Sequence, residues 1–414
     1  MTPIYNRLIV QYKDEVAFQR LKERSNMEVN KLYHMEYEEG FPPKSLSPIE
    51  RRMFNTVLIT SSLPTESNQA LYESLSEDPD IEFVQYDQKY ELFAKMPSQS
   101  TTKWWFSAIR YKRSLMSYES LHPVKVAVID SGIDHGHPDL NQRSFSTAVN
   151  RRDFTNLIWS NGTLTNPDGE PIPPSQPGYN DLHGTHVAGI IAALYNNTHT
   201  VGVANNAPLM NLRAYPDPTE ATLCAAIRYA ADNKARVINA SWGTRIDASN
   251  LNVGSALRTA IDYACSKGTV VVCAAGDDGV DVSQYVPAGF DNVITVGSVK
   301  KGATAGNYIK SESSNDGARV ISAPGVRISS LHAGNNNVML IDSGTSMSAA
   351  YVSGLVARML DREPNLIEPV AAGAGPCNAA DIILNHIHTN PLPGSIGHGI
   401  IDVEATLSNL PDLP

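Results

Sequence analysis

The stretch Gly344–Ala357, with the sequence GTSMSAAYVSGLVA, decides the fold of this chain. Larger apolar residues recur there at every fourth position, which is the spacing of a helix that buries one face. They are Met347, Tyr351, Leu355 and, just beyond, Met359. Ser346 is therefore expected in the first turn of a core helix, where free backbone N–H groups and the helix dipole favour negative charge. Taken alone, a Gly-Thr-Ser sequence at the start of a helix indicates only an N-cap.

Two earlier stretches place a carboxylate and an imidazole at the edge of regular elements. Val124–Gly132 (VKVAVIDSG) is a β-branched run that reads as a strand ending on Asp130. His183–Gly189 (HGTHVAG) opens a second small-residue helix with His183. A serine, a base that takes its proton and a carboxylate that orients the base form the usual set for nucleophilic catalysis.

In the chain order Asp, His, Ser, these stretches resemble the subtilisin-like serine proteases. Further matching stretches lie at Val237–Gly243, Val271–Gly276, Ala323–Gly325 and Gly397–Asp402. The resemblance implies a three-layer α/β fold and a serine endopeptidase with Ser346 as nucleophile, His183 as base and Asp130 as its orienting carboxylate. The alternation of strands and helices from Val124 onward independently favours a mostly parallel sheet covered on both faces. In such a sheet, sites form beyond the carboxyl ends of the strands.

Composition limits the other function classes. The 414 residues are 42% hydrophobic and 18% charged, which is typical of a globular protein. A net charge of −10 gives no electrostatic footprint for nucleic acid, and the apolar runs are too short to span a membrane. The first residues lack the pattern of a secretory signal, so we expect an intracellular protein or one whose signal is absent from this sequence. We expect a monomer that acts on protein or peptide substrates.

Residues 1–93 are predicted to form a separate small α+β domain. They read strand, helix, strand, strand, helix, strand, which suits a ferredoxin-like sandwich. The expected elements are strands at Arg7–Tyr12, Arg52–Thr60 and Ile81–Phe93 and helices at Glu15–Glu23 and Glu66–Ser76. The position of this domain before the Asp130 motif resembles the inhibitory propeptide of subtilisin-like proteases, which implies an intramolecular inhibitor cleaved after Phe93. The alternative is a permanent regulatory or docking domain.

The rest of the chain is predicted to be a linker, residues 94–123, and a peptidase domain, residues 124–414. The linker contains Trp104, Trp105 and Phe106 and is expected to pack over the core. Residues 38–48 read as an insertion in the small domain. Residues 161–180, rich in Pro, Gly, Asn and Ser, read as a surface loop beside the cleft, either inert or specificity-determining.

The resemblance assigns substrate binding to Ser241, Trp242 and Gly243. Trp242 stands where the family has a smaller apolar residue, so it either narrows the pocket or packs on the core. The opposite wall, residues 215–219, is shorter than the family's edge strand, and its prolines have no N–H to pair with a peptide. Extended-substrate binding is therefore expected to rest mainly on the Ser241 side. Ala350 and Tyr351 replace the family's Pro-His and are expected to alter only helix packing.

Asp277 is the main departure from the family. The family places an asparagine there, whose amide donates to the oxyanion, and an ionised carboxylate has no proton to donate. Losing such a donor costs roughly 10² to 10³ in turnover, a magnitude taken from this position in subtilisin itself. Three outcomes are open: Asp277 is protonated and donates, it stays ionised in a slow protease, or catalysis has been abandoned. The first is favoured and predicts an acid-side pH optimum.

No cofactor is needed for this chemistry, but the resemblance implies a candidate structural calcium site. Its ligands would be the side chains of Asp139 and Asn196 and the carbonyls of Leu194, Thr198 and Thr200. His199 stands there in place of a glycine, which speaks against the site. A zinc cluster of Asp134, His135, His137 and Asp139 is less favoured than a solvated loop. The four cysteines, Cys224, Cys265, Cys273 and Cys377, are expected to be free thiols.

Two rival functions remain open at this stage. The first is a pseudoprotease that binds peptides or regulates without useful turnover; the complete triad opposes it, whereas Asp277 and the short groove wall favour it. The second is a peptide ligase or cyclase of the same fold, which no residue selects.

Overall fold

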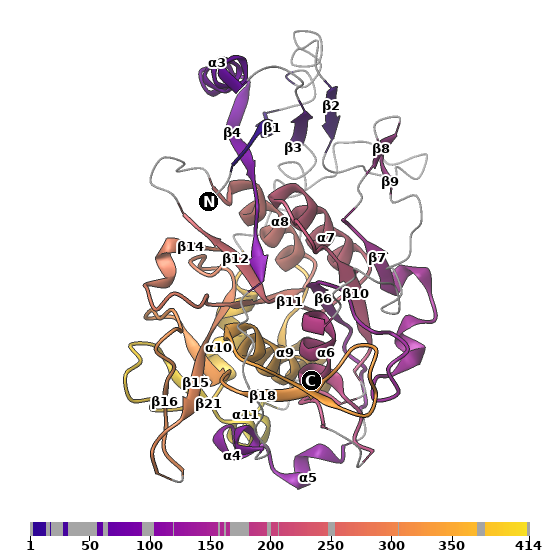
Figure 1. Ribbon diagram of the computed structural model, residues 1–414, viewed down its shortest axis with the longest axis vertical. Coiled ribbons are helices and arrows are strands. Elements are labelled where there is room, and N and C mark those ends of the chain that lie inside the picture. Colours follow the sequence, from indigo (N-terminus) through magenta and orange to yellow (C-terminus); the bar gives the residue numbers. More distant parts are fainter. Residues whose placement is uncertain are drawn as a thin grey trace.

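The computed structural model describes residues 3–13, 17, 28–31, 56–60, 65–92, 103–118, 120–155, 158–160, 163–165, 182–196, 200–205, 207–246, 253–304, 306–370 and 377–411. It consists of a large α/β body and a smaller sheet, which lies at the indigo, N-terminal end of the molecule (Figure 1). The expected helix at 15–23, except for helical Ala17, and the insertion at 38–48 lie outside the described residues. Of the loop at 161–180, only residues 163–165 are described.

The large body is organised around one sheet with the strand order β20-β21-β17-β15-β13-β11-β6-β10-β7, with β16 paired to β15. All neighbours from β7 to β21 run parallel, whereas β16 and β20 are antiparallel additions. The strands are β6 (Val126–Asp130), β7 (Arg151–Asp153), β10 (Leu209–Arg213), β11 (Val237–Ala240), β13 (Val270–Ala274), β15 (Ile294–Lys301), β16 (Tyr308–Lys310), β17 (Ile321–Pro324), β20 (Thr389–Asn390) and β21 (Gly399–Ile401). The expected subtilisin-like α/β fold with a mostly parallel sheet is confirmed.

Helices cover both faces of this sheet. On β6, Val126 and Val128 belong to one apolar cluster with helices α6 (Leu182–Ala192) and α9 (Thr345–Arg362). The alternate residues Ala127 and Ile129 belong to another cluster with α7 (Glu220–Asp232) and α8 (Ser255–Ser266). Because successive side chains of a strand point to opposite faces, the two clusters are the two outer layers of a three-layer fold.

The small sheet is antiparallel, with the order β2-β3-β1-β4, and carries helix α3. Its elements are β1 (Pro3–Tyr12), β2 (Glu28–Lys31), β3 (Thr56–Thr60), α3 (Thr65–Ser76) and β4 (Ile81–Gln88). This order is that of a split βαβ sandwich, and its core includes Leu8, Val57 and Val84. One boundary was wrong: the single strand expected over 81–93 is divided. After β4 the chain leaves this sheet, and β5 (Glu91–Leu92) pairs with a strand of the large body.

The segment before β6 packs on the core, as expected from its aromatic residues. It forms α4 (Trp104–Ala108) and α5 (Arg113–Met116), and Trp105 is buried within the α6 and α9 cluster. The C-terminal part contributes α10 (Ala379–His386) and α11 (Val403–Ser408). Arg110 pairs with Asp402 at 2.8 Å, which joins the segment to the end of the chain.

The expectation of four free cysteines was wrong. Cys265, in α8, forms a disulfide with Cys377, which precedes α10, across 112 residues of sequence. Cys224 and Cys273 are buried free thiols, as expected. The spacing of the bonded pair carries no signature, because only the folded chain brings α8 and α10 together.

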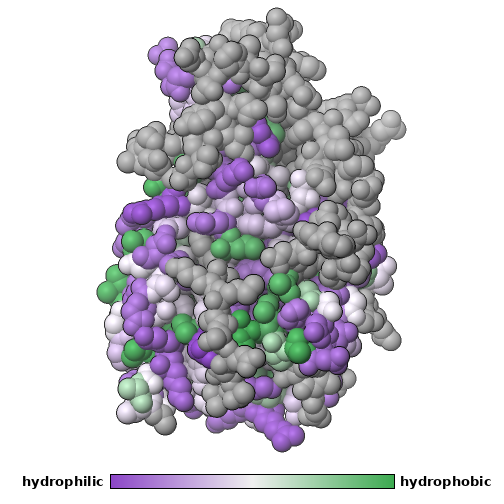
Figure 2. Space-filling model, viewed as in Figure 1, coloured by the Kyte–Doolittle hydropathy of each residue, from purple (hydrophilic) through white to green (hydrophobic). Residues whose placement is uncertain are grey.

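Among the described residues on the face shown in Figure 2, hydrophobic residues lie in small groups among hydrophilic ones. Large apolar side chains that are exposed in the described chain are scattered: Leu121, Val149, Val338 and Ile396. Among the described residues, no helix is both long and apolar enough to cross a membrane.

Candidate active site

Asp130 and His183 form a hydrogen-bonded pair at the carboxyl edge of the sheet. Asp130 is the last residue of β6, and its Oδ1 lies 2.7 Å from His183 Nδ1. Asp130 is fully buried, and its Oδ1 also accepts the backbone N–H of Ser131 at 2.6 Å. Helix α6 can approach this strand end because residue 184 is glycine: a Cβ there would lie 2.2 Å from the Gly132 carbonyl oxygen. The pair is thus held in the geometry that orients an imidazole base.

Ser346 stands in the first turn of α9, at the position expected for a nucleophile. Its Oγ donates to the carbonyl of Ser241 at 3.1 Å, and Ser241 Oγ in turn donates to the Ser346 carbonyl at 3.1 Å. His183 Nε2 is buried and has no hydrogen-bond partner within the described part of the chain. The structure therefore brings the three residues to one edge, but the serine hydroxyl must turn from Ser241 to His183 before it can be deprotonated.

Three carboxylates act on His183. Burial lowers its pKa, but the charge of Asp130 and its hydrogen bond, and then the charges of Asp342 and Asp277, outweigh burial and raise the pKa above its ordinary value. The imidazolium is therefore stabilised in this site, which suits a base that must carry a proton during the reaction. The same surroundings require a higher pH before His183 becomes neutral and can act as a base.

Asp277 lies at the N-terminus of α9, beside the nucleophile. Both of its carboxylate oxygens accept from the Thr345 backbone N–H, at 3.1 and 3.3 Å. In return, Thr345 Oγ1 accepts the backbone N–H of Gly276 at 3.1 Å. Asp277 is buried at 8% exposure, so its carboxyl faces the first turn of α9 rather than solvent. The family likeness had predicted this position for the residue.

Asn315 holds the loop that carries Asp277, and no sequence signal pointed to it. Its Oδ1 accepts the backbone N–H groups of Asp278 at 3.2 Å and Val280 at 3.0 Å, while its Nδ2 donates to the Ala275 carbonyl at 2.9 Å. These bonds span both sides of Asp277. A single buried asparagine far along the chain carries no motif, so only the structure reveals this role.

The chain itself occupies the groove next to the nucleophile. Strand β5 runs antiparallel to β12 (Trp242–Arg245), with Leu92 opposite Trp242 and Glu91 opposite Gly243. On its other side, the Tyr90 backbone N–H donates to the Pro218 carbonyl at 3.1 Å. Segment 215–219 thus contributes through a carbonyl, which prolines retain, so both walls contact this strand of the chain itself.

Trp242 is a structural residue that also meets the strand in the groove. It is fully buried, and its indole N–H donates to the Ile129 carbonyl at 2.9 Å, next to Asp130. The ring of Tyr90 packs edge-on against it, with 5.7 Å between ring centroids. Of the two roles considered for Trp242, packing on the core is the one observed, and Tyr90 covers its remaining side.

Polar residues of β4 dock the small domain on the helices behind the groove. Asp87, fully buried, accepts the backbone N–H of Ala221 at 3.2 Å at the start of α7 and pairs with Arg7 at 3.0 Å. Gln85 Oε1 accepts the backbone N–H of Ala256 at 3.4 Å in the first turn of α8. Burial raises the pKa of Asp87, although the Arg7 charge opposes this shift. The small domain therefore caps two helices of the large one.

The candidate calcium ligands are only partly assembled. Asn196 Nδ2 donates to Asp139 Oδ1 at 2.6 Å, and the Leu194 backbone N–H donates to the Asp139 carbonyl at 2.8 Å. Thr200 is buried, and Thr198 lies outside the described residues. The carboxylate and amide oxygens suit a hard cation, but the amide must turn its oxygen toward the ion.

The neighbouring loop, expected to be solvated, is only partly so: Gly136 and Pro138 are exposed and His135 is half-buried, whereas the other polar side chains are buried. His137 is 1% exposed, and its Nδ1 accepts the Asp139 backbone N–H at 3.1 Å. Asp134 is also buried and accepts the backbone N–H groups of Gly136 and Gly334. These polar groups are satisfied by backbone, which explains their burial. Within the described residues, no group of three acidic, histidine or cysteine side chains is arranged to hold a metal.

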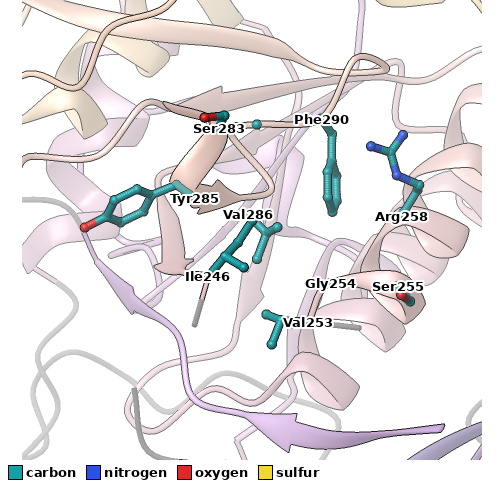
Figure 3. Close-up of a pocket in the computed structure, with 10 residues that line it drawn as sticks. Ile246, Val253, Gly254, Ser255, Arg258, Ser283, Tyr285, Val286 and Phe290 are labelled. Carbon is teal, nitrogen blue, oxygen red and sulfur yellow. The ribbon is translucent and has the colours of Figure 1, made fainter. Parts of the chain in front are cut away.

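A pocket of about 280 Å³ lies between strand β14 (Tyr285–Val286) and the start of α8 (Figure 3). Val253, Val286 and Phe290 provide much of its apolar lining. Arg258 stacks on the Phe290 ring at 4.3 Å and pairs with Asp291 at 2.6 Å. No triad residue lines this pocket, so it is distinct from the reaction site.

An aspartate–histidine pair beside a serine at a helix N-terminus, on the carboxyl edge of a parallel sheet, defines a serine hydrolase class of site. The model of the subtilase family of peptidases matches residues 122–399. The chain belongs to the subtilase family.

Relatives in sequence include the thermophilic serine proteinase of Bacillus sp. (strain AK1), which is 36% identical over 59% of this chain and 54% of its own length. Fervidolysin of Fervidobacterium pennivorans is 30% identical over 74% of this chain and 44% of its own length. Subtilisin E of Bacillus subtilis (strain 168) is 31% identical over 74% of this chain and 72% of its own length. The chain therefore spans about half the length of the first two relatives.

Two solved structures share the fold. The crystal structure of fervidolysin, described as a keratinolytic enzyme, superposes with a TM-score of 0.72 at 23% identity, covering 98% of this chain and 61% of that one. The epidermin leader peptide processing serine protease of Staphylococcus aureus gives a TM-score of 0.67 at 23% identity, covering 99% of both chains. At this identity the likeness concerns the fold alone.

Proposed function

We propose that this protein is a serine endopeptidase that hydrolyses peptide bonds in proteins and begins with its own chain. The observation that carries the proposal is the pairing of β5 with β12, which puts a peptide strand in extended conformation beside Ser346. Leu92 lies opposite Trp242, and the next position along β12 is Ser241. The Ser241 carbonyl accepts the Ser346 hydroxyl.

The same register supports cleavage after Phe93. In an antiparallel pair, advancing one residue on one strand moves one residue back on the other. A peptide that continued the register of β5 would therefore set its next residue opposite Ser241, where the nucleophile lies. Phe93 itself is outside the described residues. Until cleavage, residues 1–93 act as an intramolecular inhibitor because their tail fills the groove.

The chemistry follows from the triad. Once turned toward His183, the Ser346 hydroxyl loses its proton to Nε2 and attacks the scissile carbonyl carbon. Asp130 stabilises the imidazolium that forms, and His183 then protonates the leaving amine. Water, deprotonated by the same imidazole, hydrolyses the acyl-enzyme and releases the serine.

Asp277 serves as the oxyanion partner in its protonated form. Its burial beside α9 supports a neutral carboxyl, because desolvation disfavours the charged form. An acid O–H aimed at the oxyanion would replace the amide donor of the family. Turnover then requires neutral His183 and protonated Asp277 together. We expect a bell-shaped pH profile, with His183 setting the acid limb and Asp277 the alkaline limb; the raised pKa of His183 places the acid limb above the ordinary histidine range, which opposes an acid-side optimum.

The second candidate is a pseudoprotease. The specific observation in its favour is that Asp277 accepts the Thr345 N–H, and accepting hydrogen bonds favours an ionised carboxylate. An ionised Asp277 would repel the developing oxyanion. The chain would then keep its groove for binding peptides, with residues 1–93 as its permanent occupant.

We also propose a structural calcium ion held by Asp139, Asn196 and neighbouring carbonyls. The contact between these two side chains supports it, since both carry oxygens that a hard cation prefers. Bound ion would stabilise the folded state by mass action. The thermal midpoint should therefore fall in EGTA for the wild type and become insensitive to EGTA in Asp139→Asn. An equal midpoint with and without calcium would contradict the site.

The intact mass of purified wild type and Ser346→Ala, after incubation at several pH values, tests the function. The proposal predicts that the wild type loses residues 1–93 and that Ser346→Ala stays whole. Loss in both proteins would point to a contaminating protease. If both stay whole at every pH, the pseudoprotease is the better account.

A further inference from the structure

Asp342 is a buried carboxylate beside the catalytic histidine, four residues before the nucleophile. It ends strand β19 (Met339–Asp342), which pairs antiparallel with β18 (Ile328–Leu331) and sets Asp342 opposite Ile328. Asp342 is 5% exposed, and its Oδ1 accepts the Ser343 backbone N–H at 2.7 Å. The triad mechanism gives this residue no task.

The β18–β19 hairpin is fastened to the helix that carries His183. His186, one helical turn further along α6, shares its Nε2 with the carbonyls of Ile328 at 3.0 Å and Leu340 at 3.2 Å. Ser330 Oγ donates to the His186 carbonyl at 2.7 Å. Residues three apart lie on one face of a helix, so these hydrogen bonds at His186 bring the end of the hairpin close to His183. The charge of Asp342 accordingly acts on His183.

This carboxylate lies on the leaving-group side of the scissile bond. Strand β5 fills the groove along β12, which is the side of the residues that stay with the acyl group. His183 gives its proton to the leaving amine, so the residue that bears this amine must sit next to the imidazole. A carboxylate that faces His183 from β19 therefore faces the residue that follows the cleaved bond.

The charge of Asp342 lacks a permanent partner. Among the described residues, no lysine or arginine forms an ion pair with Asp342, and burial raises its pKa while the His183 charge lowers it. A buried carboxylate without a cation is costly, and a substrate cation would relieve that cost. In this chain Ala94 directly follows Phe93, and Lys95 stands one position further on, so the tail itself does not supply a cation directly after the proposed cleavage bond.

We propose that Asp342 is a specificity-determining residue that favours a lysine or arginine side chain directly after the cleaved bond. This inference rests on the proposed endopeptidase function. A cationic substrate side chain at this point would pair with the Asp342 carboxylate, whereas an acidic side chain would be repelled by it and by Asp130. The preference should weaken as salt rises, because screening reduces interactions between charges.

The test uses peptides that contain Tyr-Glu-Leu-Phe followed by Lys, Ala or Glu, and compares kcat/KM for the full chain. The wild type should prefer Lys over Glu by at least about fivefold, the size of a modest ion pair. Asp342→Asn keeps an acceptor for the Ser343 N–H and should bring the ratio close to one. Asp381→Asn changes an exposed carboxylate on α10 and should leave the ratio unchanged. An equal ratio in the wild type and Asp342→Asn would overturn the inference.

A second measurement does not depend on turnover. In the Ser346→Ala background, the NMR titration of His183 should move to lower pH when Asp342→Asn is added, with Asp381→Asn as the control. No movement would show that Asp342 does not face His183 and would overturn the inference even if peptides were cut. Failure to cleave any peptide would instead overturn the proposed function, and this inference with it.

Discussion

The two sides of the site differ in how they treat charge. On the triad side, Asp130 holds His183 at 2.7 Å, and carboxylates on three separate elements favour the imidazolium. On the oxyanion side, the substrate's developing negative charge would meet another carboxylate, Asp277, rather than an amide. The acid–base half needs only a turn of the Ser346 hydroxyl toward His183, whereas the oxyanion half depends on one proton. On the proposed mechanism, catalysis in this chain is therefore conditional on the protonation of Asp277.

The largest expected loss of kcat comes from substitutions of the triad residues. Ser346→Ala or His183→Ala should each lower kcat by roughly 10⁶, and combining them should add little, because the triad acts as a unit; these sizes come from the same triad in subtilisin. Steady-state kinetics on a peptide that contains Leu-Phe followed by further residues, so that the bond after Phe can be cleaved, would check this. Additive losses would contradict a shared mechanism.

A smaller effect is expected on the oxyanion side through Asn315. Asn315→Ala would leave the backbone N–H groups of Asp278 and Val280 without their acceptor and allow Asp277 to move. A misplacement near 1 Å costs up to about 10² in rate, and each buried unpaired group costs about 1–3 kcal/mol of stability. Kinetics and thermal unfolding would measure both losses. Asn335→Ala, at an exposed asparagine, is the matched control. An unchanged kcat in Asn315→Ala would show that the position of the loop carrying Asp277 does not affect catalysis.

The smallest expected effect is on the time after which proteolytic activity appears, and it comes from the small N-terminal domain that covers the groove. Asp87→Ala removes the carboxylate that caps α7 and pairs with Arg7. Loss of such a cap costs about 0.5–2 kcal/mol, so proteolytic activity should appear a few-fold to about 30-fold sooner after the protein is placed in assay buffer. Asp217→Asn, which breaks the exposed pair with Lys89 at the same interface, should change this time little. If activity appeared after the same time in the wild type, Asp87→Ala and Asp217→Asn, the cap at Asp87 would not be what holds the small domain on the large one.

The pH dependence of the triad side follows from the raised pKa of His183. The base works only when neutral, so a raised pKa moves the acid limb of kcat/KM to higher pH. Removing a nearby carboxylate charge lowers the pKa of His183 and moves the acid limb of kcat/KM to lower pH. The protein's own acid limb should therefore lie above the ordinary histidine range and move to lower pH when Asp342 is neutralised.

Local sequence motifs were enough to predict where Asp130, His183 and Ser346 lie in the fold, because each residue ends or begins an element whose pattern is visible in a few residues. The parallel sheet and the place of Asp277 followed in the same way. Contacts between distant residues could not be predicted: the support from Asn315, the approach of Asp342 to His183 and the bond between Cys265 and Cys377 have no local pattern. The break between β4 and β5 was also missed, because pairing with β12, and not local propensity, ends β4.

The pH profile of kcat/KM for the wild type beside Asp277→Asn tests the central claim most directly. If a protonated Asp277 completes the oxyanion site, the wild type should lose activity on the alkaline side, while Asp277→Asn keeps its activity there and leaves the acid limb in place, because the protonated carboxyl carries no charge in that pH range. Two profiles of the same shape would contradict the account.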